Sequence, residues 1–157
     1  MSIAVRRAEE RDTEKILLLL NEVLELHAKI RPDLFIPGTT KYTREELLAI
    51  IANDETPVFV ADDEGNVAGY AFCVIKQPPF STNMKPAKTL YIDDLCVDEN
   101  IRGKHVGTLL FDYVREKARE IGCQYVTLNV WEGNDNARRF YDKMGMSVRE
   151  TMMEIRL

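Results

Sequence analysis

Cysteine and histidine are scarce in this sequence, and their scarcity argues against two kinds of site. The chain of 157 residues has 3 cysteines and 2 histidines. The cysteines (Cys73, Cys96 and Cys123) are scattered, and no Cys-x-x-Cys occurs. We therefore expect neither a disulfide scaffold nor a zinc site, and no metal is predicted. Buried thiols in a reducing compartment fit these positions better.

Long apolar runs and an excess of positive charge are also missing. No stretch approaches the roughly 20 apolar residues that span a bilayer. No signal-peptide core follows Arg6 and Arg7, so we expect a cytoplasmic protein with no membrane partner. The formal net charge of −5 argues against nucleic acid as the main partner.

What is present fits one folded domain over residues 1–157. Hydrophobic residues make up 45% and charged residues 30%, and this length can bury a substantial core. Period-two patterns predict strands at 3–7, 57–61, 66–76, 88–97, 124–130 and 146–157. Helical spacing and caps predict helices at 13–29, 43–53, 106–121 and 134–144. We predict an α/β (α+β) fold: a three-layer α/β/α domain with a central mixed sheet of six or seven strands.

Residues 91–110 are the part of the sequence from which the functional interpretation starts. An apolar, β-favouring run ends at Val97 after two acids, Asp93 and Asp94. A short basic loop with two glycines, Arg102–Gly107, then opens onto a helix. The start of a helix presents unpaired backbone N–H groups and the positive end of the helix dipole. The local pattern thus predicts a phosphate-binding loop.

Two motifs resemble the GNAT superfamily of acetyl-CoA-dependent N-acetyltransferases. Arg102 and Gly107 fit the family's loop pattern Arg/Gln-x-x-Gly-x-Gly/Ala, which lies between a strand and a helix. Residues 134–146 look like its downstream signature Asn-x-x-Ala-x-x-x-Tyr-x-x-x-Gly-Phe, with Asn134 and Tyr141 at the same separation. The predicted order of elements also matches, so the resemblance covers nearly the whole chain.

The resemblance implies acetyl-CoA as the cosubstrate and a set of residues that bind it. Leu95 to Val97 look like the strand end whose backbone pairs with the pantetheine arm. The implied contacts are Leu95, Cys96, Val97, Arg102, Gly103, Lys104, His105, Val106, Gly107 and Asn134. His105 replaces the central glycine of the loop pattern. Its side chain could point outward and leave the amide free, donate to a phosphate, or crowd the site.

Acetylation of an amine needs a base for the amine and a proton for the departing thiolate. Asp93 and Asp94 are the candidate bases, and strand alternation suggests that only one of them faces a given layer. Similarity to spermidine/spermine acetyltransferases points to Asp93; the alternative is a structural hydrogen-bond acceptor at a strand irregularity. The resemblance makes Tyr141 the general acid, whereas its helical spacing alone would place it in the core.

Four further features have two interpretations each. His27 either sits at a helix C-terminus or lines a substrate pocket. The apolar loop residues 34–36 either tuck onto the core or wall that pocket. Trp131 and Glu132 either line the acceptor site or form a surface turn. Asn134 either contacts the cosubstrate or only caps a helix.

The leading interpretation is direct transfer of acetyl from acetyl-CoA to a primary amine, of a small molecule rather than a macromolecule. The alternatives are acetylation of a protein N-terminus or lysine, and a non-catalytic CoA-binding regulatory module, which the change at His105 would permit. The resemblance also allows a homodimer.

Overall fold

A mixed sheet runs through the middle of the computed structural model, which describes residues 2–77, 82–101 and 104–157. Among these residues the sheet has five strands in chain order: β1 (Ile3–Arg7), β2 (Val58–Asp63), β3 (Asn66–Lys76), β4 (Thr89–Val97) and β5 (Tyr125–Leu128). Neighbours pair antiparallel from β1 to β4, and β5 runs parallel to β4. The predicted mixed sheet is confirmed, but six or seven strands was too many.

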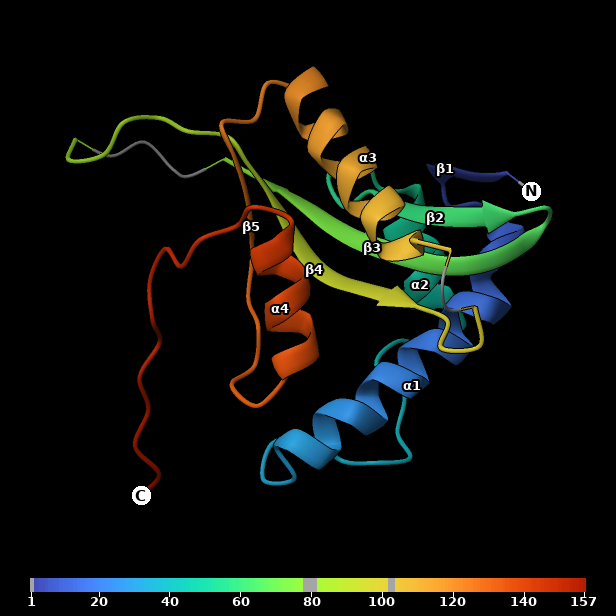
Figure 1. Cartoon of the computed structure of the whole chain (residues 1–157), viewed down its shortest axis with the longest axis horizontal. Coiled ribbons are helices and arrows are strands. Elements are labelled where there is room, and N and C mark those ends of the chain that lie inside the picture. Colours follow the sequence, from blue (N-terminus) through green and yellow to red (C-terminus); the bar gives the residue numbers. More distant parts are fainter. Residues whose placement is uncertain (1, 78–81, 102–103) are drawn as a thin grey trace.

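Helices cover both faces of this sheet and form the outer two layers (Figure 1). A short 3-10 turn, η1 (Glu10–Asp12), leads into α1 (Thr13–Ile30), and α1 and α2 (Arg44–Ala52) pack on one face. On the other face lie α3 (Val106–Glu120) and α4 (Asp135–Lys143). None of the helices in the described ranges combines the length and apolar character needed to cross a membrane.

Local sequence signals account for several element boundaries. Thr43 Oγ1 accepts from the Glu46 amide at 3.1 Å, and the Glu46 carboxylate accepts from the Thr43 amide at 2.9 Å. This confirms the predicted capping box at the start of α2. Glu64 and Gly65 both have positive φ, 52° and 93°. That combination makes the tight turn between β2 and β3 that suits the right-handed twist of a hairpin.

The C-terminal segment, residues 146–157, corrects one prediction. It was expected to be a strand, but the structure has no strand there, and the segment runs away from the helices (Figure 1). Met152 and Ile155 are 94% and 84% exposed. Glu154 Oε1 pairs with Arg31 Nη1 at 2.7 Å. A strand needs a neighbour to take up its backbone hydrogen bonds, and the apolar pattern alone does not supply one.

The pairing of β4 with β3 is irregular at Asp93, beside the candidate site. Cys73 of β3 pairs with Ile92, and Phe72 pairs with Asp94, so the register passes over Asp93. This is a β-bulge, which bends the strand and re-aims side chains. On its other side β4 pairs with β5 only as far as Ile92 and Leu128. Beyond Ile92 the two parallel strands part.

Candidate active site

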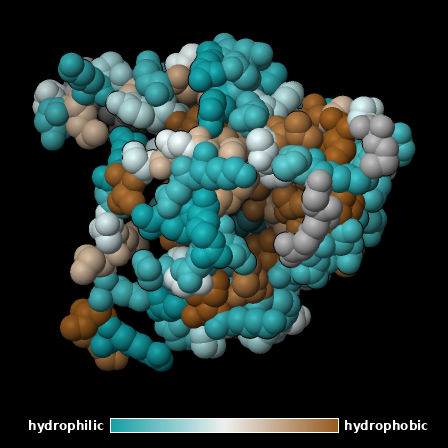
Figure 2. Space-filling view, viewed as in Figure 1, coloured by the Kyte–Doolittle hydropathy of each residue, from teal (hydrophilic) through white to brown (hydrophobic). Residues whose placement is uncertain are grey.

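A cavity of about 300 Å³ lies where α1, the segment that follows it and β4 meet. Half of its twelve lining residues are apolar side chains of α1 and residues 34–36, and the polar half includes Lys41, Asp93 and Asp94. On the face seen in Figure 2, apolar side chains gather beside a hollow between α4 and α1. Both acids therefore line one cavity. The expectation that only one of them would face a given layer is wrong, because the bulge interrupts strand alternation.

Asp94 is held in place by a hydrogen bond from the buried strand β3. The Tyr70 hydroxyl donates to Asp94 Oδ2 at 2.7 Å, and Tyr70 itself is fully buried. Burial raises the pKa of Asp94, although the bond from Tyr70 and the charge of Lys41 pull the other way. A carboxyl group with a raised pKa is a better proton acceptor near neutral pH than an ordinary one.

Asp93 has a different partner. Lys41 Nζ donates to Asp93 Oδ2 at 3.1 Å, and both side chains are partly exposed. Burial alone would lower the pKa of Lys41, but the charges of Asp93, Tyr42 and Asp94 raise it overall. Lys41 is therefore a cation at neutral pH, and it neutralises the carboxylate that the sequence favoured as base.

Tyr141 packs against the core cluster, as its helical spacing predicts, and the general-acid role that the resemblance implies stays a prediction. Its ring packs against Phe111 and Phe140, with centroids 6.1 Å and 5.2 Å away. Burial raises the pKa of the phenol well above its ordinary value, and charges at Asp94 and Cys96 add to the shift. Tyr141 thus belongs to the core cluster, lies within electrostatic reach of Asp94, and stays protonated.

Cys96 lies near the end of β4 with its thiol buried. Its exposure is 9%, and burial raises its pKa to about 12. Cysteine attacks as the thiolate, so a thiol held protonated is a poor nucleophile. Within the described residues no group of three or more His, Cys, Asp or Glu side chains could hold a metal ion.

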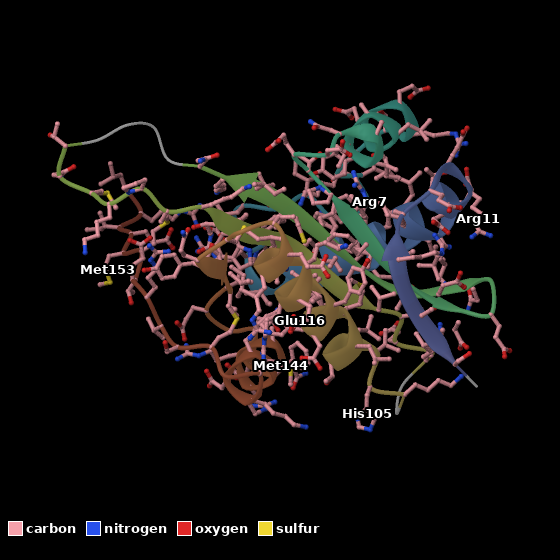
Figure 3. The ribbon with its side chains drawn as sticks, turned by 90° about the horizontal axis from the view of Figure 1, so that it is seen from above. Arg7, Arg11, His105, Glu116, Met144 and Met153 are labelled. Atoms are coloured by element: carbon pink, nitrogen blue, oxygen red, sulfur yellow. The ribbon has the colours of Figure 1, made fainter. Side chains whose placement is uncertain are left out.

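The start of α3 explains why the loop pattern has a glycine where this chain has His105. His105 takes the left-handed conformation, with φ 56° and ψ 34°, which glycine adopts without strain. Its side chain is exposed and points away from the body (Figure 3). No side chain caps the helix there. The first amides of α3 lack a side-chain cap, as an anion-binding helix start requires.

The other predicted loop residues are only partly described. Arg102 and Gly103 lie outside the described residues. Lys104 Nζ donates to Asp63 Oδ2 at 3.1 Å, which ties the loop to β2. A Cβ on Gly107 would meet the Phe140 ring at 3.2 Å, so α3 and α4 pack closely at this point. An uncapped helix start and the end of β4, parted from β5, together fit the anionic and extended parts of acetyl-CoA.

Comparison with known proteins gives the family. The family model described as "Acetyltransferase (GNAT) family" matches residues 20–146. This chain belongs to the GNAT family. The shared region runs from the middle of α1 to just past α4 and so includes the cavity and the loop.

Individual relatives of this GNAT domain are moderately similar. A crystal structure of a mutant protein from Bacillus halodurans is 31% identical, with a TM-score of 0.93 and 98% and 99% of the two chains covered. The thialysine N-epsilon-acetyltransferase of Bos taurus is 26% identical over 149 residues, 91% of this chain and 83% of that protein. An uncharacterized N-acetyltransferase of Methanocaldococcus jannaschii is 27% identical over 85% of this chain. The chain spans only 58% of the length of that archaeal relative.

Asn134 is the N-terminal cap of helix α4 in this GNAT domain. Its side-chain oxygen accepts from the Ala137 amide at 3.3 Å and so caps α4. A cap of this kind fixes where the helix begins and therefore where Tyr141 lies two turns later. The contact with the cosubstrate that the family resemblance implies for Asn134 stays a prediction.

An aromatic row borders the cavity. The Phe35 ring packs against His27 at 5.3 Å and edge-on against Trp131 at 5.5 Å. His27 and residues 34–36 line the cavity, and His27 also lies in the last turn of α1, as its other interpretation expects. That this cavity binds the substrate stays a prediction. Trp131 reaches the cavity wall through Phe35. Glu132 is exposed, as a surface turn predicts.

Sequence reasoning missed two residues of the site, Lys41 and Tyr70. Lys41 lies in a polar segment with nothing to mark it, and Tyr70 looks like any aromatic residue of a buried strand. Their partners are 52 and 24 residues away along the chain. One signal was available for Tyr70: a hydroxyl in a fully apolar strand needs a hydrogen-bond partner.

Proposed function

We propose that this GNAT domain transfers the acetyl group of acetyl-CoA to a primary amine of a small molecule, directly and without an acyl-enzyme. The observation that carries the proposal is Asp94, a half-buried carboxyl group that lines the cavity and accepts from the Tyr70 hydroxyl, and whose charge acts on the phenol of Tyr141. When bound, acetyl-CoA supplies the thioester that donates the acetyl group. A relative named for acetylating thialysine supports an amine as acceptor.

The first task of the site is to deprotonate the amine. An alkyl amine has a pKa near 10.4, so only about 0.04% is neutral at pH 7, and deprotonation costs roughly 4–5 kcal/mol. We assign this proton to Asp94, because burial raises its pKa towards the working range of a general base. Asp93 is paired with Lys41 and serves to position that side chain.

The second task is to protonate the leaving thiolate. Tyr141 fits it because burial keeps the phenol protonated until a stronger base comes within reach. Cys96 is a poor nucleophile, because burial raises the pKa of its thiol and so keeps it protonated at neutral pH. These two protonation states support direct transfer from the donor to the amine.

The cosubstrate is held, in this proposal, by the elements on either side of the Asp pair. The backbone of Leu95 to Val97 would receive the pantetheine arm where β4 has left β5. The loop Arg102–Gly107 and the first amides of α3 would bind the pyrophosphate, with Arg102 supplying a fixed charge. The exposed His105 side chain leaves its own amide available for this contact.

The experiment is a steady-state assay of CoA release with a panel of amines, comparing Tyr141→Phe with Tyr113→Phe. Tyr113 packs on Phe59 in the same core cluster and takes no part in the cavity. Tyr141→Phe should lower kcat by about 10²- to 10⁴-fold, the usual worth of general acid catalysis. Its affinity for acetyl-CoA, measured by calorimetry, should hold. Equal rates for both variants would remove Tyr141 as the acid.

A further inference from the structure

The cavity in front of the Asp pair differs in character from a site for polyamines or sugars. Six of the twelve described residues that line it are apolar, namely Leu20, Val23, Leu24, Leu34, Phe35 and Ile36, and the only uncharged hydroxyl groups among the others belong to Thr39 and Thr40. We propose that the acceptor is a primary amine on an apolar body, an aryl-alkyl or alkyl chain, and that Lys41 excludes polycations. The proposal rests on the transfer reaction proposed above and names its class of acceptor.

Part of the cavity wall is exposed to solvent and yet consists of apolar side chains. Leu34 and Ile36, the two residues that flank Phe35 in the sequence, are 52% and 69% exposed. Exposed apolar side chains grouped around a hollow are typical of a ligand groove. The loop that carries them is held by its own packing, because Phe35 lies between His27 and Trp131. The wall is therefore formed before any ligand binds.

The charges in the cavity suit one amine and no more. Among the described residues that line it, the acids are Asp93 and Asp94 alone. Lys41 already neutralises Asp93 at 3.1 Å. Burial, and then the charge of Lys41, lower the pKa of His27, which adds no charge at neutral pH. A single amine can give its proton to Asp94, and a second cationic group on the same molecule finds no unpaired carboxylate among the described residues that line the cavity.

Lys41 also acts against cations directly. Its ammonium lies at the place where a second ammonium of a polyamine would seek Asp93. To bind, the polyamine must displace Lys41 or accept the repulsion of a like charge at close range. An amine with an apolar body meets neither penalty, because its remaining atoms contact the wall. Rejection by an introduced like charge is a common source of specificity.

The first test compares kcat/KM for 2-phenylethylamine and hexylamine with that for spermidine and glucosamine. We expect the apolar amines to be preferred by about 100-fold, the size of discrimination that several buried methylenes supply. Lys41→Met should shift the ratio of spermidine to phenylethylamine by about 10-fold towards spermidine. Lys29→Met, on the exposed side of α1, is the matched control and should leave the ratio unchanged. A preference for spermidine or glucosamine in the wild-type protein overturns the proposal.

The second test reads binding without turnover. Trp131 is the single tryptophan of the chain and touches Phe35, so its fluorescence reports occupation of the cavity. We expect phenylethylamine to change it and spermidine to leave it unchanged. Ile36→Asp, at a position that is 69% exposed, should weaken phenylethylamine binding by about 10-fold. Unchanged binding in this variant overturns the proposal.

The two tests separate failure of the acceptor class from failure of the reaction. If phenylethylamine binds and no amine is acetylated, the ligand class stands and the transfer reaction is lost. If amines are acetylated but polar ones are preferred, the reaction stands and the ligand class is lost.

Discussion

At the scale of single residues, the burial of Asp94 raises the pKa of the carboxyl group that we propose as the base. Its carboxyl group is hydrogen-bonded by Tyr70 and lies near Lys41, yet burial still raises its pKa. The ionised form is therefore less favourable than for an ordinary aspartate, and the protonated form persists to higher pH. Activity that needs the ionised base should fall as the pH drops through this raised pKa.

The variant Asp94→Asn tests whether the loss of activity at low pH comes from protonation of Asp94. The variant keeps an oxygen that accepts from Tyr70 but loses the base, so the rate should come to depend on amine that is already neutral. We expect kcat/KM to be at least 10²-fold lower at pH 7 and to keep rising towards high pH. A pH–rate profile from pH 5 to 10 is the measurement, and Asp112→Asn, exposed on α3, is the control. A profile that matches the wild type would exclude Asp94.

His105 is the second informative residue, because its backbone conformation is costly for a side chain. A left-handed conformation disfavours residues with a Cβ by roughly 1–2 kcal/mol, and His105 has φ 56°. Replacing His105 by glycine would remove this penalty, but the greater conformational freedom of glycine in the unfolded chain offsets part of the stability gained. His105→Gly should raise the free energy of unfolding by about 0.5–1 kcal/mol. His105→Val, which is β-branched, should lower it, and urea titration would measure both. A loss of stability in the glycine variant would contradict the assigned conformation.

At the scale of elements, the site depends on how closely β3, β4 and α3 pack. A Cβ on Gly69 would lie 2.6 Å from the Cys96 carbonyl oxygen, and its next neighbours are Leu110 and Val106 of α3. A backbone atom cannot rotate away as a side chain can. The glycine in β3 thus allows β4 and α3 to approach each other at the start of the proposed cosubstrate site.

Gly69→Ala should therefore be more damaging than Gly107→Ala. The first places a methyl group against backbone and should cost about 1–3 kcal/mol, the range for overpacked cores. The second meets the Phe140 ring at 3.2 Å, which can shift, so we expect a smaller loss. Chemical denaturation of the two variants side by side measures the difference. Equal losses in the free energy of unfolding would mean that the β4 backbone shifts as readily as the Phe140 ring, and would contradict the prediction.

How far the elements could be predicted differs between the two halves of the site. The strand, loop and helix from β4 to α3 follow from local patterns, and so does the cap at Asn134. The bulge at Asp93 does not, because it arises from the pairing of β4 with β3. Residues 146–157 show the opposite error: their alternating pattern favours a strand, but pairing needs a neighbour that the pattern cannot name.

At the scale of the whole molecule, a network around Arg6 joins the first strand to the body. Arg6 Nη1 donates to Asp12 Oδ2 at 2.8 Å, and Arg6 Nε donates to Asp62 Oδ2 at 3.0 Å. Burial raises the pKa of Asp12, but the bonds from Arg6 and the Glu9 amide bring it below its ordinary value. The bond from Arg6 lowers the pKa of Asp62 as well. The pairs thus connect β1, the start of α1 and β2.

These shifts predict the direction of acid unfolding. A carboxyl group with a lowered folded pKa stabilises the fold fully above its unfolded value, near 3.9. That stability is lost as the pH falls through the lower folded value. The contribution of Asp12 and Asp62 to the free energy of unfolding should stay level from pH 7 to about 5 and decline below about 4. Arg6→Gln should flatten this decline, as urea titration at pH 7 and 3.5 would show. Unchanged pH dependence in the variant would refute the role of the network.

The order of the elements from β1 to α4, the three layers and the place of the loop could be predicted from the sequence alone, because caps, turns and periodicity act between near neighbours. The tertiary structure decided that Asp93 and Asp94 both reach the cavity, that Lys41 takes one of them and that Tyr70 holds the other. These contacts join residues 24 to 52 positions apart. They exist only once the bulge, α1 and the segment after it have come together, so no local pattern could reveal them.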